Sequence, residues 1–127
     1  MPIELNHTIE HARDPLASAT FLADVLGLAP PFRFGPFQCV QLDNRVTLDF
    51  LPAGEHLAIE HYAFLVSEAE FDAIFERIRQ RELPYWADPF HREAGRINHH
   101  DGGRGVYWND PNGHYLEIIT RPYGSGS

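Results

Sequence analysis

Two histidines stand at equivalent places in the two halves of this 127-residue chain, and a glutamate follows near its end. His7 comes after four residues of strand-like sequence, and a helix N-cap is predicted seven residues later at Asp14. His61 also comes after four such residues, with a predicted N-cap six residues later at Ser67. Glu117 lies in a strand-like run just after a turn. Two imidazoles and one carboxylate make a 2-His-1-carboxylate ligand set, which leaves coordination positions open for substrate, oxygen or water.

The neighbours of Glu117 support this interpretation. On a strand, alternate side chains share a face, so Glu117 shares its face with Tyr115 and Ile119. An unpaired carboxylate in such a place is costly unless something neutralises it, and a cation does so directly. The alternative is an exposed glutamate together with two hydrogen-bonded core histidines. The three residues taken together favour a metal site at His7, His61 and Glu117.

The composition excludes several classes of protein. The formal net charge is −8, and all ten basic residues are arginines, so binding to nucleic-acid phosphates is not expected. No apolar run approaches the ~20 residues of a membrane span. A single cysteine, Cys39, excludes an internal disulfide and a multi-cysteine zinc site. With no secretory signal at the N-terminus, we expect a cytoplasmic protein.

The sequence pattern of each half of the chain predicts a strand, a helix and then further strands. Together these elements give an α+β protein. In the first half Asp14 and Pro15 start a helix that Gly27 ends. In the second half Ser67 and Glu70 form a capping box. Strands are predicted at 3–11, 37–42, 45–51, 59–66, 105–109 and 114–120. We expect one domain at 1–122, built from modules at 3–52 and 57–121, and a flexible tail at 123–127.

Four segments of the chain resemble the vicinal oxygen chelate superfamily, which includes glyoxalase I, extradiol dioxygenases, fosfomycin-resistance transferases and bleomycin-binding proteins. They are Leu5-Asn6-His7, Ala17 to Gly27 with its Leu-Gly ending, Glu60-His61-Tyr62-Ala63-Phe64, and the run from Tyr107 through Asp110-Pro111-Asn112-Gly113-His114 to Glu117. The resemblance implies paired βαβββ modules, a cupped mixed sheet, one divalent metal held by His7, His61 and Glu117, and a homodimer. Asp49 lies where four-ligand members carry a further ligand, so it is either that ligand or an acceptor that fixes a ligand histidine.

Further site residues are expected beside these ligands. Tyr107 precedes Glu117 by ten residues, the separation at which the dioxygenases carry a catalytic tyrosine; the fosfomycin transferases keep a tyrosine there too. The glycine-rich passage that follows His99 and His100 and contains Arg104 resembles a dioxygenase loop. Its histidines are suited to moving protons and its arginine to holding an anion. The residues expected to contact substrate are Phe37, Asp49, Trp86 and Trp108.

The sequence departs from every branch of the superfamily. Residues 45–49 lack the acid-base histidine of extradiol enzymes, so His56, His100 or Asp49 has to substitute for it. The absence of lysine and the presence of Ile9 weaken the resemblance to fosfomycin transferases. We expect a metal-dependent, extradiol dioxygenase-like enzyme using Fe²⁺ or Mn²⁺, although such ligands also accept Ni²⁺, Co²⁺ or Zn²⁺. The alternatives are a glyoxalase-type lyase or isomerase, a fosfomycin-type thiol transferase, and a non-catalytic protein that binds small molecules.

Overall fold

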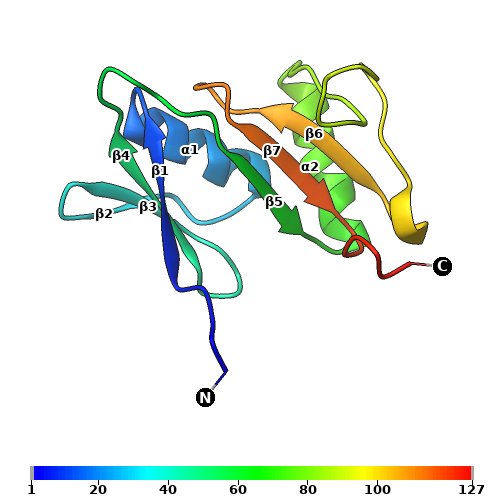
Figure 1. Ribbon diagram of the computed structural model, residues 1–127, viewed down its shortest axis with the longest axis horizontal. Helices are drawn as coiled ribbons and strands as arrows, with labels where there is room; N and C mark the ends of the chain where they lie inside the picture. Colours follow the sequence, from blue (N-terminus) through cyan, green and yellow to red (C-terminus); the bar gives the residue numbers. More distant parts are fainter. Residues whose placement is uncertain (1, 127) are drawn as a thin grey trace. The chain divides into compact units, whose positions relative to one another are not determined.

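The computed structural model describes residues 2–126, and the chain forms two compact units, residues 1–58 and 59–127. The predicted modules 3–52 and 57–121 differ from these units only at the ends and in the segment that connects them. Figure 1 shows that each unit holds one helix and its own sheet. None of the helices in the described part of the chain is long and apolar enough to cross a membrane.

The first unit is a four-stranded sheet with one helix against it. Its elements are β1 (His7–Ala12), α1 (Pro15–Leu26), β2 (Phe32–Phe34), β3 (Phe37–Gln41) and β4 (Thr47–Pro52). The strand order is β1-β4-β3-β2, with β1 parallel to β4 and the other pairs antiparallel. Helix α1 contacts β1, β3 and β4. One face of the sheet therefore packs against α1.

The ends of α1 follow from local chemistry. The Asp14 side chain accepts a hydrogen bond from the Ala17 amide at 3.1 Å, and Pro15 occupies the first turn. Gly27 ends the helix with φ 74°, a left-handed conformation that costs glycine little. The predicted helix is confirmed at both ends.

The second unit has three strands and one long helix. Its elements are β5 (His61–Leu65), α2 (Glu68–Gln80), the short 3₁₀ helix η1 (His100–Gly102), β6 (Gly105–Asn109) and β7 (Tyr115–Ile119). The order is β5-β7-β6, with β5 parallel to β7 and β6 antiparallel to it. An isolated bridge pairs Trp86 with Tyr107, on the far side of β6. The predicted α+β fold with mixed sheets is confirmed: the first unit has the predicted βαβββ order, and the named strands of the second give βαββ.

Helix α2 starts with the predicted capping box: the Ser67 hydroxyl accepts from the Glu70 amide, and the Glu70 carboxylate accepts from the Ser67 amide. Phe71, Ile74 and Ile78 form its buried face, as their helical spacing predicts. The fold differs from the expectation mainly in strand β2, which follows two prolines and was not predicted, and in β1, which begins at His7.

Candidate metal-binding half-sites

His61 and Glu117 lie on neighbouring strands of the second unit and face the same side. The register pairs His61 with Tyr115, so Glu117 lies two residues further along β7. His61 Nε2 is 2.9 Å from Glu117 Oε1. The carboxylate side chain is 2% exposed, whereas the imidazole is 43% exposed. An imidazole nitrogen and a carboxylate oxygen that converge in this way are donors that could serve as two ligands of a divalent metal.

Two tyrosines complete the surroundings of Glu117. Tyr107 on β6 is in direct register with it, and the Tyr123 hydroxyl donates to Glu117 Oε2. The hydroxyls of Tyr107 and Tyr123 are 3.1 Å apart. Burial raises the pKa of Tyr107 well above its ordinary value, and a hydrogen bond to Glu117 and its negative charge add to this. Tyr107 therefore stays protonated and can donate a hydrogen bond.

The turn before β7 fixes the start of both β5 and β7. Asp110 Oδ1 accepts hydrogen bonds from the amides of Asn112 and His114, at 2.8 and 2.9 Å. His114 Nδ1 in turn accepts from the Glu60 amide at 2.9 Å. Because Glu60 directly precedes His61, the Asp-Pro-Asn-Gly-His sequence positions His61 as well as the hairpin.

The first unit repeats the same register. His7 pairs with Thr47 and Ile9 pairs with Asp49, so Asp49 lies two residues beyond the partner of His7. This is the offset that relates Glu117 to His61. Cys39 on β3 pairs with Asp49 on the antiparallel strand β4. In the same way, Tyr107 on β6 pairs with Glu117 on β7. Asp49 is therefore the counterpart of Glu117, and His7 is the counterpart of His61.

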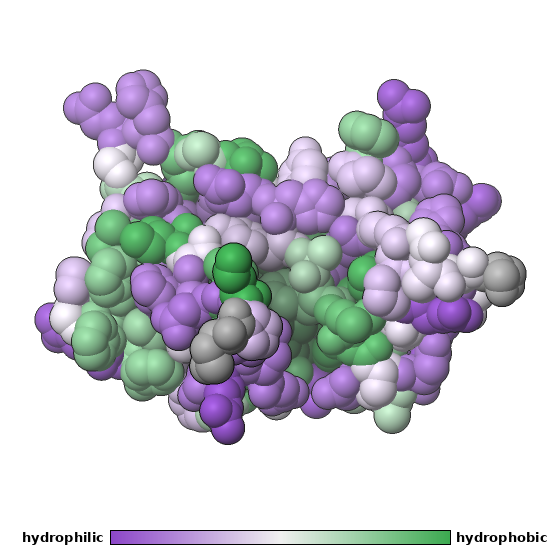
Figure 2. Space-filling model, turned by 60° about the horizontal axis from the view of Figure 1, so that its bottom comes forward, coloured by the Kyte–Doolittle hydropathy of each residue, from purple (hydrophilic) through white to green (hydrophobic). Residues whose placement is uncertain are grey.

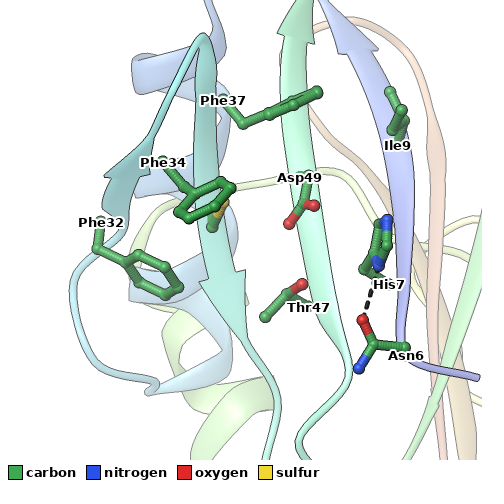
Figure 3. A pocket seen from close by; sticks show the side chains of 9 residues that line it. Asn6, His7, Ile9, Phe32, Phe34, Phe37, Thr47 and Asp49 are labelled. Atoms are coloured by element: carbon green, nitrogen blue, oxygen red, sulfur yellow. Dashed lines mark hydrogen bonds between the residues drawn. The ribbon is translucent and has the colours of Figure 1, made fainter.

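A cavity of about 360 Å³ lies over this face of the first unit. Its walls come from all four strands and from the residue before β1: Asn6, His7, Ile9, Phe32, Phe34, Phe37, Cys39, Thr47 and Asp49. In Figure 3 the side chains of His7 and Asp49 lie on neighbouring strands, on the same side of the sheet as Phe34 and Phe37. Phe34 and Phe32 are 72% and 46% exposed, and apolar surface is visible over this unit on the left of Figure 2. The cavity thus combines apolar walls with a few polar atoms, as small-molecule sites do.

The polar atoms of this cavity are prepared for a ligand. Asn6 Oδ1 lies 2.7 Å from His7 Nδ1, and because a carbonyl oxygen only accepts, the tautomer protonated at Nδ1 satisfies this contact and leaves the lone pair on Nε2. Asp49 Oδ1 is buried and has no hydrogen-bond partner among the residues that the structure describes. Burial raises the pKa of the Cys39 thiol to about 11, and the hydrogen bond to Asp49 and its charge contribute.

The two predicted tryptophans lie in different environments. Trp86 is bridged to Tyr107 and stacks on His91, with ring centroids 3.7 Å apart. Trp108 is fully buried and pairs with Leu116, on the opposite face of β6 from Tyr107. A residue without exposed surface cannot line an open pocket, so the prediction for Trp108 is wrong: alternation along the strand turns it into the core.

Arg104 is held by two carboxylates of α2. Its guanidinium lies 2.8 Å from Glu68 and 2.8 Å from Asp72, and it sits over the Phe71 ring at 4.3 Å. A substrate anion would have to displace both carboxylates, so this position favours a structural role over the predicted one. His99 is exposed, and the ring of His100 is 6.2 Å from that of Tyr123.

Sequence reasoning missed Tyr123 and His91. Tyr123 lies in the segment expected to be a flexible tail, but residues 124 and 126 donate hydrogen bonds to Asp101 and the segment is docked. His91 contacts Trp86 and Tyr115, from a loop with no periodic pattern. Only the abundance of aromatic residues near the C-terminus could have pointed to Tyr123.

Comparison with known proteins agrees with this geometry. The chain is 63% identical to oxidase ChaP-H1, whose structure superposes with a TM-score of 0.95 over 97% of this chain and 99% of the other. It is 59% identical to oxidase ChaP-H2, with a TM-score of 0.97 over the full length of both. It is also 28% identical to glutathione transferase FosA of Serratia marcescens, over 90% of this chain and 78% of that protein. A family model matches residues 4–118, and the chain belongs to the glyoxalase/bleomycin resistance protein/dioxygenase superfamily.

Proposed function

We propose that this protein is a metal-dependent oxidase, with dioxygenase-like chemistry, that acts on a small substrate carrying two adjacent oxygens. The observation that carries the proposal is the His61–Glu117 pair with Tyr107 in register beside Glu117. The identity of 63% and 59% to two oxidases supports oxidation over the other reactions of the superfamily.

The proposed metal ligands are His7, His61 and Glu117, with Fe²⁺ or Mn²⁺ favoured. The donor set fits, because it offers two imidazole nitrogens and one carboxylate, borderline-hard ligands that these ions accept. Asp49 occupies the position equivalent to Glu117 and is either a fourth ligand or an acceptor for a substrate hydroxyl. When bound, the metal would hold both substrate oxygens, polarise them as a Lewis acid and offer a position for oxygen.

The remaining residues would bind and orient the substrate. Tyr107 donates a hydrogen bond to a substrate oxygen, since its raised pKa keeps the phenol protonated. Phe37 and the exposed Phe34 supply an apolar wall that excludes water from an aromatic or aliphatic body. His99 and His100 remain the proposed proton carriers.

The same proposal includes a homodimer, and the metal ligands then come from one copy or from both. Mixing His7→Ala protein with Glu117→Ala protein separates the two arrangements. If His7 of one copy joins His61 and Glu117 of the other, each mixed dimer regains one of its two sites. Because about half of the dimers are mixed at random exchange, ~25% of all sites recover. If all three ligands come from one copy, no site recovers.

Oxygen uptake tests the proposed reaction. The protein loaded anaerobically with Fe²⁺ should consume oxygen with a catechol, and Tyr107→Phe should lower kcat/KM by 10- to 100-fold, as expected for a lost hydrogen bond in the site. Tyr85→Phe is the matched control, because Tyr85 packs against Phe75 of α2 away from Glu117. Absence of oxygen uptake with both Fe²⁺ and Mn²⁺ would contradict the proposal.

A second candidate function is thiol transfer to an epoxide such as fosfomycin, which the similarity to FosA favours. The chain has no lysine, although the fosfomycin transferases that it resembles use one. Conjugation of glutathione to fosfomycin by the Mn²⁺-loaded protein, without oxygen uptake, would favour this candidate. Ligand binding without either reaction would indicate a non-catalytic binding protein.

A further inference from the structure

The C-terminal segment, residues 121–126, is held across the second unit by one carboxylate. Asp101 accepts hydrogen bonds from the Gly124 amide through Oδ2 and from the Gly126 amide through Oδ1, each at 3.1 Å. Asp101 itself has φ 56°, a left-handed conformation inside η1. These contacts fix the backbone on both sides of Ser125 and carry Tyr123 with it.

Tyr123 places a phenol hydroxyl against the proposed metal ligand Glu117 and beside Tyr107, the proposed hydrogen-bond donor to the substrate. Its hydroxyl donates to Glu117 Oε2 and lies 3.1 Å from the Tyr107 hydroxyl. The other carboxylate oxygen of Glu117 is 2.9 Å from His61 Nε2. Both oxygens of this buried carboxylate are therefore engaged, one of them by a residue of the C-terminal segment.

The attachment of Tyr123 is reversible by its nature. The residue is 50% exposed, and the amides of Gly124 and Gly126 are held by one partly exposed side chain, that of Asp101. A segment with few buried contacts opens at a low free-energy cost. An incoming molecule that offers its own hydroxyl to Glu117 and Tyr107 can replace the phenol without disturbing the core.

We propose that residues 121–126 form a strap that fills the substrate position with the phenol of Tyr123, so that a phenolic or catecholic ligand binds by displacing it. The strap is an internal competitor: ligand affinity is reduced by the fraction of molecules in which it is closed. That the Tyr123 hydroxyl occupies the substrate position rests on the proposed function. The contacts that hold the strap do not require a metal.

Binding of 4-nitrocatechol to the metal-free protein, followed by its absorbance, tests the competition directly. Tyr123→Phe removes a hydrogen bond to a carboxylate, and we expect it to lower the Kd of 4-nitrocatechol about tenfold. Tyr85→Phe should leave the Kd unchanged. Gly126→Ala should also lower it, because a Cβ at this position would lie 2.1 Å from Asp101 Cα and undock the strap, whereas Gly54→Ala meets nothing within 4 Å and serves as its control.

Amide hydrogen exchange at Gly124 and Gly126 supplies a readout that is independent of affinity. Exchange should quicken when 4-nitrocatechol binds to wild type, and Asp101→Asn should quicken it without ligand. A higher Kd in Tyr123→Phe would make Tyr123 part of the binding site and overturn the proposal. An unchanged Kd, no binding in any variant, or slowed exchange on binding would overturn it as well. Failure of oxygen uptake with these results intact would reject the proposed reaction alone.

Discussion

Cys39 and Asp49 face each other across neighbouring strands of the first unit, and the carboxylate raises the pKa of the thiol. The thiol is 3% exposed and its pKa is raised to about 11 from an ordinary value of 9.0. At neutral pH it is therefore a neutral, weakly polar lining of the cavity. Asp49 keeps one oxygen for a ligand.

Because Cys39 is the single cysteine, its alkylation by iodoacetamide reports this environment. At pH 8 we expect the folded protein to react at least ~100-fold more slowly than the urea-unfolded chain, since a rise of two pKa units lowers the thiolate fraction by that factor. The raised pKa means that reactivity grows as pH rises toward 11. Asp49→Asn should lower the pKa and quicken the reaction, and equal rates in the two folded proteins would count against the pairing.

At the scale of elements, the short turn between β6 and β7 is stabilised by several hydrogen bonds to Asp110. Asp110 is 7% exposed and accepts three hydrogen bonds, two from backbone amides and one from the Asn112 side chain at 3.1 Å. Its loss would leave buried donors without an acceptor, which is more costly than the loss of a surface contact.

Replacement of Asp110 by alanine should lower the free energy of unfolding by about 3 kcal/mol. Asp110→Asn keeps an acceptor oxygen for the two amides and should cost about 1 kcal/mol. Urea unfolding measures both. His114 also accepts a hydrogen bond from the Glu60 amide, directly before His61, so Asp110→Ala should weaken metal binding too. An unchanged metal affinity would show that the turn does not position His61 for metal binding.

Arg104 offers a second comparison at the element scale. Its contacts join the start of β6 to α2, and it stacks on Phe71, so Arg104→Ala should cost about 1 kcal/mol of stability through lost packing and cation–π contact. KM for the substrate should stay within twofold. A tenfold rise in KM with unchanged stability would instead place Arg104 in the substrate site.

Local chemistry explains which elements could be predicted from the sequence. Both helices were predicted because Asp14, Gly27 and the Ser67–Glu70 box mark their ends. Strand β2 could not be, because its three residues are too few for a periodic pattern. The docked segment around Tyr123 depends on hydrogen bonds to Asp101, which lies over twenty residues away, and no local pattern reports such a contact.

At the scale of the whole molecule, the sequence shows two similar halves, and the structure adds their common strand register. His7 and His61 were predicted from their place before each helix. The equivalence of Asp49 with Glu117 depends on how β1 pairs with β4 and β5 with β7, and pairing between strands so far apart cannot be read from one sequence. Trp108 was misplaced for a related reason, since a shift of one residue turns a side chain to the other face.

Metal content of the purified protein, measured for wild type, Glu117→Gln and Glu68→Gln, tests the proposed metal site most directly. Glu68→Gln is the control because it changes a carboxylate of α2 that binds Arg104 rather than His61. We predict about one equivalent of Fe²⁺ or Mn²⁺ in wild type and in Glu68→Gln, and loss of at least ~90% in Glu117→Gln, because an amide replaces a carboxylate that would bind the metal. Retention of full metal by Glu117→Gln would contradict the proposal that Glu117 is a metal ligand.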